Sequence, residues 1–216
     1  MPAVFPTMLV VARTSTPVPQ GALPGLIRAA FDAESVHLDR VSLAMLAVLS
    51  ALETGRGASL TNNNFGFITA GPNYEGTVFR PAWFEESEAA GNPKLERLHE
   101  EMKAGRAPSA FRAYMTQEDG ARDFARVLLA NFPEVISAAK VSDAEGFRSA
   151  LALKYSPDYR NPKATESIAK LMREFGLTPS VISTAGTGPT GLFMFALVLW
   201  LAWRHSKKGR ARAVGA

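Results

Sequence analysis

The chain has 216 residues, 47% of them apolar, which is enough for one well-packed domain with a small appendage. It contains no cysteine, and this excludes disulfide frameworks and thiolate metal sites. The three histidines, His37, His99 and His205, are too scattered for a metal-ligand set, and no Ser/His/Asp pattern with nucleophile-elbow glycines occurs. We therefore expect neither a metal nor a cofactor.

The positive charge is concentrated at the C-terminal end. The formal net charge is +4, and five of the 24 basic residues lie in residues 204–212 without an acidic neighbour. The preceding 203 residues therefore hold 19 basic and 20 acidic residues. Because the body is about neutral, we expect no specific nucleic-acid binding beyond that of a basic tail.

The first part of the chain predicts an arm followed by two helices. Residues 1–20 hold four prolines and lack the basic start and long apolar stretch of a secretory signal, so we expect an irregular arm. Residues 23–37 have helical apolar spacing. Asp39 can cap a second helix, whose apolar positions follow a 3.6-residue period as far as Leu52.

Glu53 stands at the end of that second helix. It shares a neighbouring face with Leu46 and Leu49, so it borders the apolar stripe. A carboxylate near a helix C-terminus opposes the helix dipole. Apolar neighbours would raise its pKa, as a proton donor near neutral pH requires. The alternative is a surface glutamate at a helix end.

The middle of the chain changes character. In residues 61–83, Gly, Asn and Pro separate short β-branched and aromatic runs, which predicts loops and a small β-hairpin. Residues 84–106 are rich in charge and show little apolar periodicity. We expect them to form a solvated insertion that is partly helical.

Helical patterns return after this insertion. Thr116 can cap one helix, and Pro133 can open the next. Ser142 and Glu145 have the spacing of a capping box, and a last amphipathic helix ends at Gly176. The predicted fold class is mainly α (α+β), a helical domain with a small β-hairpin excursion.

The C-terminal part predicts a membrane anchor. Residues 177–184 read as a linker, and residues 185–203 form an uncharged segment that would reach about 28 Å as a helix, close to a bilayer core of about 30 Å. Trp200 and Trp203 suit a membrane interface, and the basic tail of residues 204–216 follows. We expect one transmembrane helix, the tail on the cytoplasmic side and the large domain on the other.

Three short segments stand out by their motifs: residues 53–57 (ETGRG), residues 62–66 (NNNFG) and residues 111–114 (FRAY). Together they resemble the glucosaminidase family of bacterial autolysins and flagellar peptidoglycan hydrolases, a branch of the lysozyme-like superfamily. The resemblance implies a lysozyme-like domain over residues 21–176, peptidoglycan as the substrate, and Glu53 as the catalytic acid.

The chain also departs from that family. Arg56 replaces the usual aromatic residue, and a cation beside Glu53 would lower its pKa. The second carboxylate of the family lies on the hairpin, and the matching region makes Glu85 or Glu86 the candidate. The alternative is that both are solvated charges.

The resemblance implies five further cleft residues, namely Asn63, Asn64, Phe65, Tyr114 and Tyr155. The asparagines would hydrogen-bond sugar or hold the acid, and the tyrosines would stack on sugar. The alternatives are asparagines that form turns with left-handed backbone, and aromatic residues that pack in the core.

These inferences predict a membrane-anchored peptidoglycan hydrolase that cleaves β-1,4 bonds between amino sugars. The alternatives are a lytic transglycosylase or muramidase of the same superfamily, and an inactive structural membrane protein with this fold. A C-terminal span without an N-terminal signal suggests a virion protein of a membrane-containing phage, or else a bacterial envelope protein. The expected partners are peptidoglycan, a lipid bilayer and other virion or envelope proteins.

Overall fold

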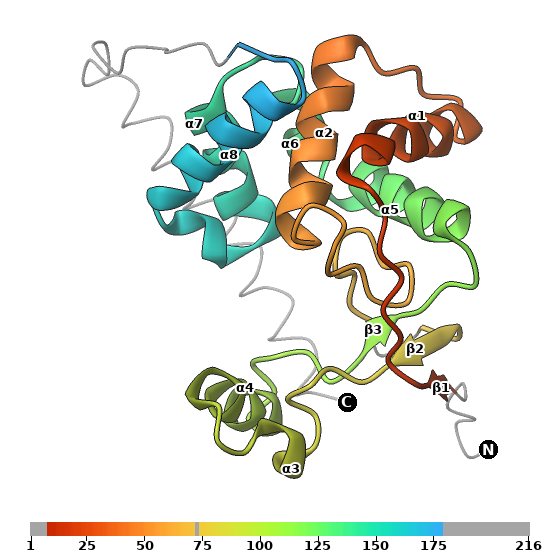
Figure 1. The fold of residues 1–216 in the computed structure, drawn as a ribbon, viewed down its shortest axis with the longest axis vertical. Helices are drawn as coiled ribbons and strands as arrows, with labels where there is room; N and C mark the ends of the chain where they lie inside the picture. The colour runs from red at the N-terminus through yellow and green to blue at the C-terminus, as the bar shows by residue number, and fades with distance from the viewer. Residues whose placement is uncertain (1–7, 72–73, 179–216) are drawn as a thin grey trace, which may run out of the picture. The chain divides into compact units, whose positions relative to one another are not determined.

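The structure is a computed structural model that describes residues 8–71 and 74–178. These residues are mainly helical, with one small sheet (Figure 1). The α-helices are α1 (Leu23–Ala33), α2 (Arg40–Glu53), α3 (Glu86–Ala89), α4 (Pro93–Lys103), α5 (Gln117–Asn131), α6 (Pro133–Ala138), α7 (Ala144–Ala150) and α8 (Lys163–Glu174). The strands are β1 (Leu9–Val11), β2 (Thr77–Phe79) and β3 (Phe111–Arg112). Short helical turns are η1 (Gln20–Ala22), the π-helical η2 (Leu151–Tyr155) and the 3-10 helix η3 (Pro157–Arg160).

Helix α2 forms the centre of the helical part. Every residue from Ser42 to Ala51 is buried, as expected of a helix that is apolar on all sides. It packs against α1 and α8, and α1 in turn packs against α5 (Figure 1). Because α2 is held on several sides, its C-terminal residue, Glu53, has a fixed position.

Several predicted helix ends are confirmed. The Asp39 carboxylate accepts a hydrogen bond from Ser42 N at 2.7 Å, and the Thr116 hydroxyl accepts one from Asp119 N at 3.1 Å. Gly176 follows α8 with a φ of 76°, in the left-handed region that favours glycine. The capping box predicted for Ser142 is wrong, because Asp143 is the N-cap of α7.

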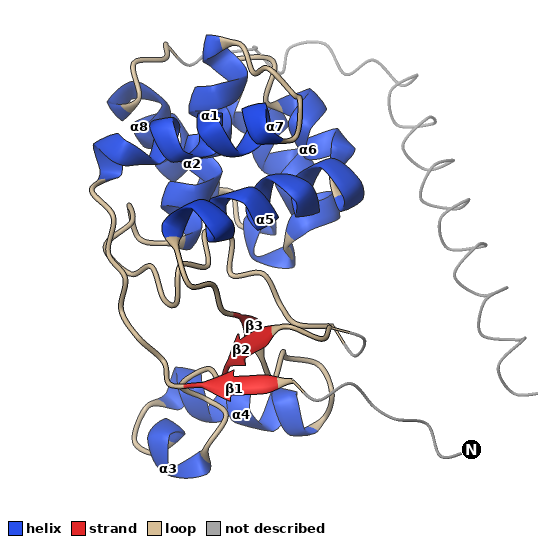
Figure 2. Ribbon diagram, turned by 90° about the vertical axis from the view of Figure 1, so that its right-hand side faces the viewer, coloured by secondary structure: helices blue, strands red, loops and turns tan. Residues whose placement is uncertain are grey.

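The predicted β-hairpin within residues 61–83 is also wrong. Strand β2 pairs antiparallel with β3, which lies beyond α3 and α4, and pairs parallel with β1 on its other side (Figure 2). Residues 65–69 contribute a single bridge, between Thr69 and Phe111. They cannot extend as a strand because the Asn64 side chain bonds Ile68 and because Phe67 has a φ of 47°.

The N-terminal arm is more ordered than predicted. In addition to β1, its backbone pairs with the loop after α2, where Thr16 N donates to Leu60 O at 2.9 Å and Val18 N donates to Gly57 O at 3.0 Å. Val18 is buried in the main core. The arm therefore supports the loop that follows Glu53.

The predicted membrane span at residues 185–203 lies outside the described residues, as do the basic tail and most of the linker. Among residues 8–71 and 74–178, no helix is both long enough and apolar enough to cross a bilayer.

Candidate active site

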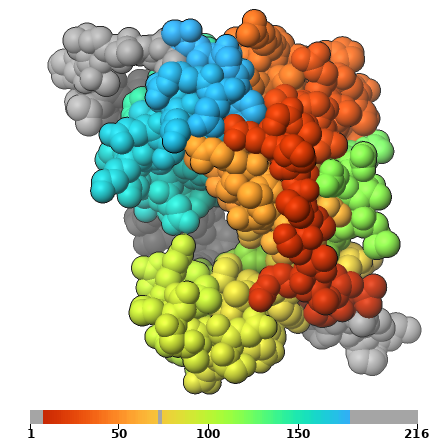
Figure 3. All heavy atoms as spheres, in the orientation of Figure 1, coloured from red at the N-terminus to blue at the C-terminus, as the bar shows by residue number. Residues whose placement is uncertain are grey.

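A cleft of about 830 Å³ contains Glu53. Besides Glu53 of α2, its lining residues come from three parts of the chain: the loop at residues 66–69, the segment from Trp83 through α4 to Arg112, and the helical side at residues 127–132 and 155–158. Figure 3 shows this hollow between the spheres of α4 and those of residues 151–160. A cleft of this volume, with a carboxyl group and aromatic side chains in its wall, suits a carbohydrate.

The sequence after Glu53 ends α2 sharply. The Thr54 hydroxyl donates to Ser50 O at 2.6 Å and accepts from Gly57 N at 3.0 Å. Gly55, Arg56 and Gly57 all have positive φ angles. A Cβ atom at Gly57 would lie 2.2 Å from Val18 O, so no side chain fits there. The Thr-Gly-Arg-Gly segment is therefore a helix stop that leaves Glu53 as the last helical residue.

The carboxyl group of Glu53 has a pKa raised from 4.5 to about 7. The main cause is burial, which penalises the charged form, and the charge of Asp158 adds to it. A hydrogen bond from Tyr159 acts in the opposite direction but is outweighed. The raised pKa predicted from the apolar neighbours of Glu53 is thus confirmed.

Tyr159 is the closest polar partner of that carboxyl group. Its hydroxyl donates to Glu53 Oε1 at 2.5 Å across 106 positions of sequence, and burial together with the nearby carboxyl group raises the pKa of Tyr159 well above its usual value. Tyr159 is therefore a neutral donor at all physiological pH values. Sequence reasoning missed Tyr159, because its partner Glu53 lies 106 positions away and no local pattern links the two residues.

Tyr155, a predicted cleft residue, does line the cleft. Its hydroxyl donates to Gly66 O at 2.7 Å, and its ring lies 6.5 Å from that of Tyr159. A Cβ atom on Gly66 would lie 2.8 Å from the same hydroxyl. Tyr155 thus joins the helical side of the cleft to the loop at residues 66–69.

Arg56 does not act on Glu53. Its guanidinium makes a two-pronged ion pair with Glu174 of α8, with N–O distances of 3.2 Å, and it does not line the cleft. Glu174 also accepts a bond from Gln20. The expectation that Arg56 would lower the pKa of Glu53 is wrong, because this cation is bound elsewhere.

The predicted asparagines are structural in their contacts. Asn63 Nδ2 donates to Tyr114 O at 3.0 Å, while Asn64 Nδ2 donates to Ile68 O and Arg112 O, both at 3.0 Å. Asn63 has a left-handed φ of 56°, as the turn alternative proposed. Phe65 is fully buried in the main core, so none of these three residues lines the cleft.

Tyr114 is likewise turned away from the cleft. Its hydroxyl donates to Asp123 Oδ2 at 2.5 Å, and Asp123 also accepts Nη1 of Arg112 at 2.8 Å. Arg112 itself lines the cleft, with its guanidinium 4.6 Å from the ring centre of Tyr74. Tyr114 therefore supports the wall residue Arg112 through Asp123.

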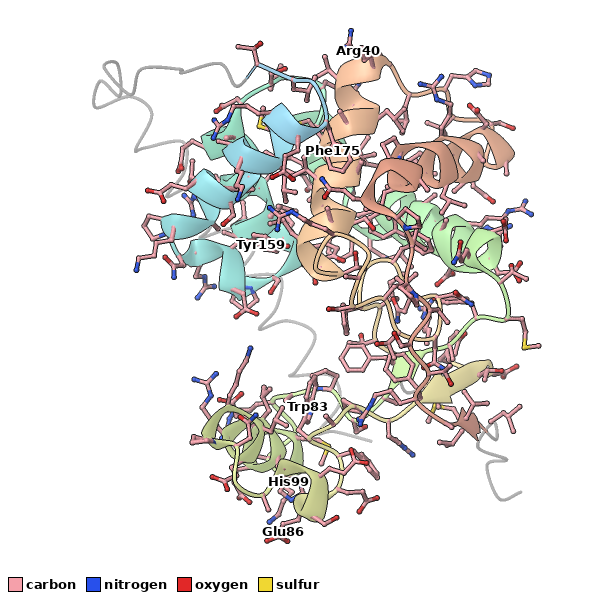
Figure 4. The ribbon with its side chains drawn as sticks, viewed as in Figure 1. Arg40, Trp83, Glu86, His99, Tyr159 and Phe175 are labelled. Carbon is pink, nitrogen blue, oxygen red and sulfur yellow. The ribbon has the colours of Figure 1, made fainter. Side chains whose placement is uncertain are left out.

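The two predicted second carboxylates do not line the cleft. Glu85 is the residue before α3, and Glu86 is the first residue of that helix. In Figure 4, Glu86 lies at the bottom of the part formed by α3 and α4, and Trp83 lies at its top. Instead, Glu101 of α4 reaches the cleft wall. The charge-rich sequence around Glu101 gave no sign of this, because the cleft wall combines segments that are distant in the chain.

Three aromatic side chains of the cleft wall were also missed. Phe67 and Trp83 pack edge-on against Phe111, with ring centres 5.7 and 5.8 Å apart, and all three line the cavity. Trp83 Nε1 donates to Pro108 O, and the His99 ring bonds Trp83 O at 2.8 Å (Figure 4). These bonds hold the indole in place beside the cavity, where it can stack on a sugar ring.

Comparisons with known proteins give structural similarity only. The sequence matches no protein-family model and no curated protein. The fold is similar to the peptidoglycan hydrolase from Sphingomonas sp. A1, at 23% identity over 78% of this chain and 99% of that one, with a TM-score of 0.46. A mutant of that hydrolase gives 22% identity over 72% and 97% of the two chains, with a TM-score of 0.44. The glycoside hydrolase domain of Salmonella typhimurium FlgJ gives 14% identity over 88% and 95%, also with a TM-score of 0.44. At these identities and TM-scores the similarities assign no activity to this chain.

Proposed function

We propose that this protein is a peptidoglycan hydrolase in which Glu53 is the general acid. One observation carries the proposal: Glu53 lies in a cleft of about 830 Å³, and its carboxyl pKa is raised to about 7. A group with this pKa is about half protonated at neutral pH, so it can give a proton and later take one back. The ETGRG, NNNFG and FRAY segments, which resemble glucosaminidases, support peptidoglycan as the polymer.

In the proposed reaction, protonated Glu53 gives its proton to the oxygen of a β-1,4 bond between amino sugars. The bond between that oxygen and the anomeric carbon then breaks, and positive charge develops on the sugar ring. The hydroxyl of Tyr159 keeps its bond to Oε1, so Oε2 is the oxygen left to face the leaving group. Tyr159 is in this way a positioning residue.

Water completes the hydrolysis. We propose that Glu101 takes a proton from this water as its oxygen bonds to the anomeric carbon, because Glu101 lines the cleft from α4 whereas Glu85 and Glu86 do not. In the other route open to an amino sugar, the acetamido oxygen attacks first and water opens the resulting ring.

A lytic transglycosylase is the second candidate. In that reaction one glutamate first protonates the leaving oxygen and then, as a base, takes the proton of the sugar's own O6, which closes onto the anomeric carbon. The pKa of Glu53, raised to about 7, suits a group that acts first as an acid and then as a base.

The termini of the products test both candidates. Purified peptidoglycan is digested with the protein, and the fragments are analysed by mass spectrometry. The hydrolase predicts reducing ends, with reducing N-acetylglucosamine if the bond is that of a glucosaminidase. Anhydro-muramyl ends would establish the transglycosylase instead. If no bond is cleaved, the remaining alternative is an inactive structural protein with this fold.

We further propose that residues 185–203 anchor this domain in a membrane, either in a phage virion or in a bacterial envelope. The uncharged length of that segment and the basic residues 204–216 support the proposal. Alkaline extraction of membranes tests it: the anchored protein stays with the lipid. Detection in purified phage particles would favour the virion, and detection in bacterial inner membranes alone would favour the envelope.

A further inference from the structure

Helix α4 turns one face toward the cleft. Five of its residues, here called the α4 face, line the cavity: Lys94, Leu95, Arg97, Leu98 and Glu101. Their spacing of three, four and seven residues places them on one side of a helix. The α4 face is therefore a continuous part of the cleft wall.

The attachment of α4 to the rest of the protein uses a different side chain. His99 is the buried residue of this helix, and its ring donates to Trp83 O at 2.8 Å. Leu95 and Leu98 are half-buried and border the cavity instead of a core. Apolar side chains at a cavity wall, on a helix anchored from elsewhere, are available to a ligand.

Two cations of the α4 face are also available. Arg97 approaches Glu101 at 3.7 Å in an exposed i, i+4 pair, a geometry that contributes little stability. Lys94 makes no ion pair with any described residue. By contrast, the third cation of the cleft wall, Arg112, is held at 2.8 Å by Asp123.

The proposed substrate contains a matching group. Its glycan backbone consists of N-acetylated sugars and is uncharged, whereas the short peptides attached to its lactyl groups carry carboxylates and alanine methyl groups. Cations beside leucines match those peptides, and the aromatic residues Phe67, Trp83 and Phe111 match the sugar rings.

We propose that the α4 face is a subsite for the anionic stem peptide of peptidoglycan, with Lys94 and Arg97 pairing its carboxylates and Leu95 and Leu98 packing against its alanines. This inference rests on the proposed function. A peptide carboxylate binding Arg97 replaces Glu101 as its partner, which frees Glu101 within the cleft. The subsite makes the protein selective for peptide-bearing strands over bare glycan.

Binding measurements test the subsite without requiring catalysis. The full-length Glu53→Gln protein serves as host, so that the polymer is not consumed. Glycan strands are immobilised through their sugar termini, either with their stem peptides or after removal of the peptides by an amidase. The lactyl carboxylates that the amidase frees are then converted to methylamides, so that the stripped strands are uncharged. Binding by the host is compared with binding by two variants of it. The α4-face variant also carries Lys94→Ala and Arg97→Ala, and the control variant also carries Lys103→Ala and Arg106→Ala. The control loses the same charge from the same region but outside the cleft lining.

The host is expected to bind peptide-bearing strands about tenfold more tightly than stripped strands, and the α4-face variant is expected to bind both within about twofold. The control variant keeps the preference. The subsite is overturned if the host binds both polymers equally. It is also overturned if the α4-face variant keeps the preference, even where its affinity for both polymers falls by the same factor. Failure of the proposed function is a separate result, in which the unmodified protein releases no products although the binding preference is present.

Discussion

The hydroxyl of Tyr159 lies 2.5 Å from Oε1 of Glu53, and this contact joins two residues 106 positions apart in the chain. It fixes the direction of the carboxyl group at the end of α2. It also opposes, without cancelling, the effect of burial on the Glu53 pKa. Under the proposed function, the pH dependence of cleavage should therefore respond to both neighbours of Glu53, Tyr159 and Asp158.

Replacing Tyr159 with Phe removes the hydrogen bond that lowers the Glu53 pKa, while the ring still fills its buried site. The acid must be protonated to act, so activity is lost as pH rises through its pKa. In Tyr159→Phe we expect this loss to move to higher pH, and kcat to fall about tenfold because the carboxyl group is less well oriented. A profile of kcat/KM against pH checks the shift. An unchanged profile with reduced kcat would mean that Tyr159 serves packing alone.

Replacing Asp158 with Asn removes a negative charge that raises the Glu53 pKa. The loss of activity with rising pH should then move to lower pH, opposite to the shift in Tyr159→Phe. The same kcat/KM profile measures it, and high salt should reduce the difference between this variant and the unmodified protein because Asp158 is exposed. A shift in the same direction as that of Tyr159→Phe would contradict the assigned role of Asp158.

Glu53 should also reduce the stability of the fold above neutral pH. Its folded pKa of about 7 lies above the ordinary value of 4.5, so between these values the folded state binds more protons than the unfolded state. This contribution to stability is present below pH 4.5 and is lost as pH rises toward 7. Glu53→Gln should therefore be more stable than the unmodified protein at pH 8, by at most about 3 kcal/mol, with little difference at pH 4. Urea unfolding at the two pH values measures the free energy of unfolding of both proteins. If the variant and the unmodified protein differ by the same amount at both pH values, burial does not raise the pKa of Glu53.

The proposed role of Glu101 as the base that activates water can be tested against Glu86, a candidate that the sequence predicted. If Glu101 activates water, Glu101→Gln should lower kcat about 100-fold, while Glu86→Gln, outside the cleft lining, should leave it unchanged. Release of soluble fragments from purified peptidoglycan measures both. A large loss of activity in the Glu86 variant would support the second carboxylate that the sequence predicted. Normal rates in both variants would favour catalysis by Glu53 without a second carboxylate of the protein.

The helical elements were predictable because their signals are local. The apolar period of α2 and the caps at Asp39 and Thr116 depend on residues within a few positions of one another, and the structure confirms them. The position of Glu53 against an apolar surface followed from the same local pattern.

The parts that sequence reasoning missed depend on contacts between distant segments. Strand β2 finds its partner β3 beyond α3 and α4, and this pairing accompanies the placement of Trp83 and Glu101 in the cleft wall. Tyr159 contacts Glu53 although it follows that residue by 106 positions in the chain. No period or motif within one segment encodes such contacts.

The proposed function depends on Glu53 as the donor of the proton that cleaves the glycan. Its most direct test compares kcat/KM on purified peptidoglycan for the unmodified protein, Glu53→Gln, and a control, Glu166→Gln, which changes an exposed carboxylate on α8. We expect kcat/KM to fall about 1,000-fold or more in Glu53→Gln and to stay unchanged in the control. Unchanged cleavage by Glu53→Gln would contradict it.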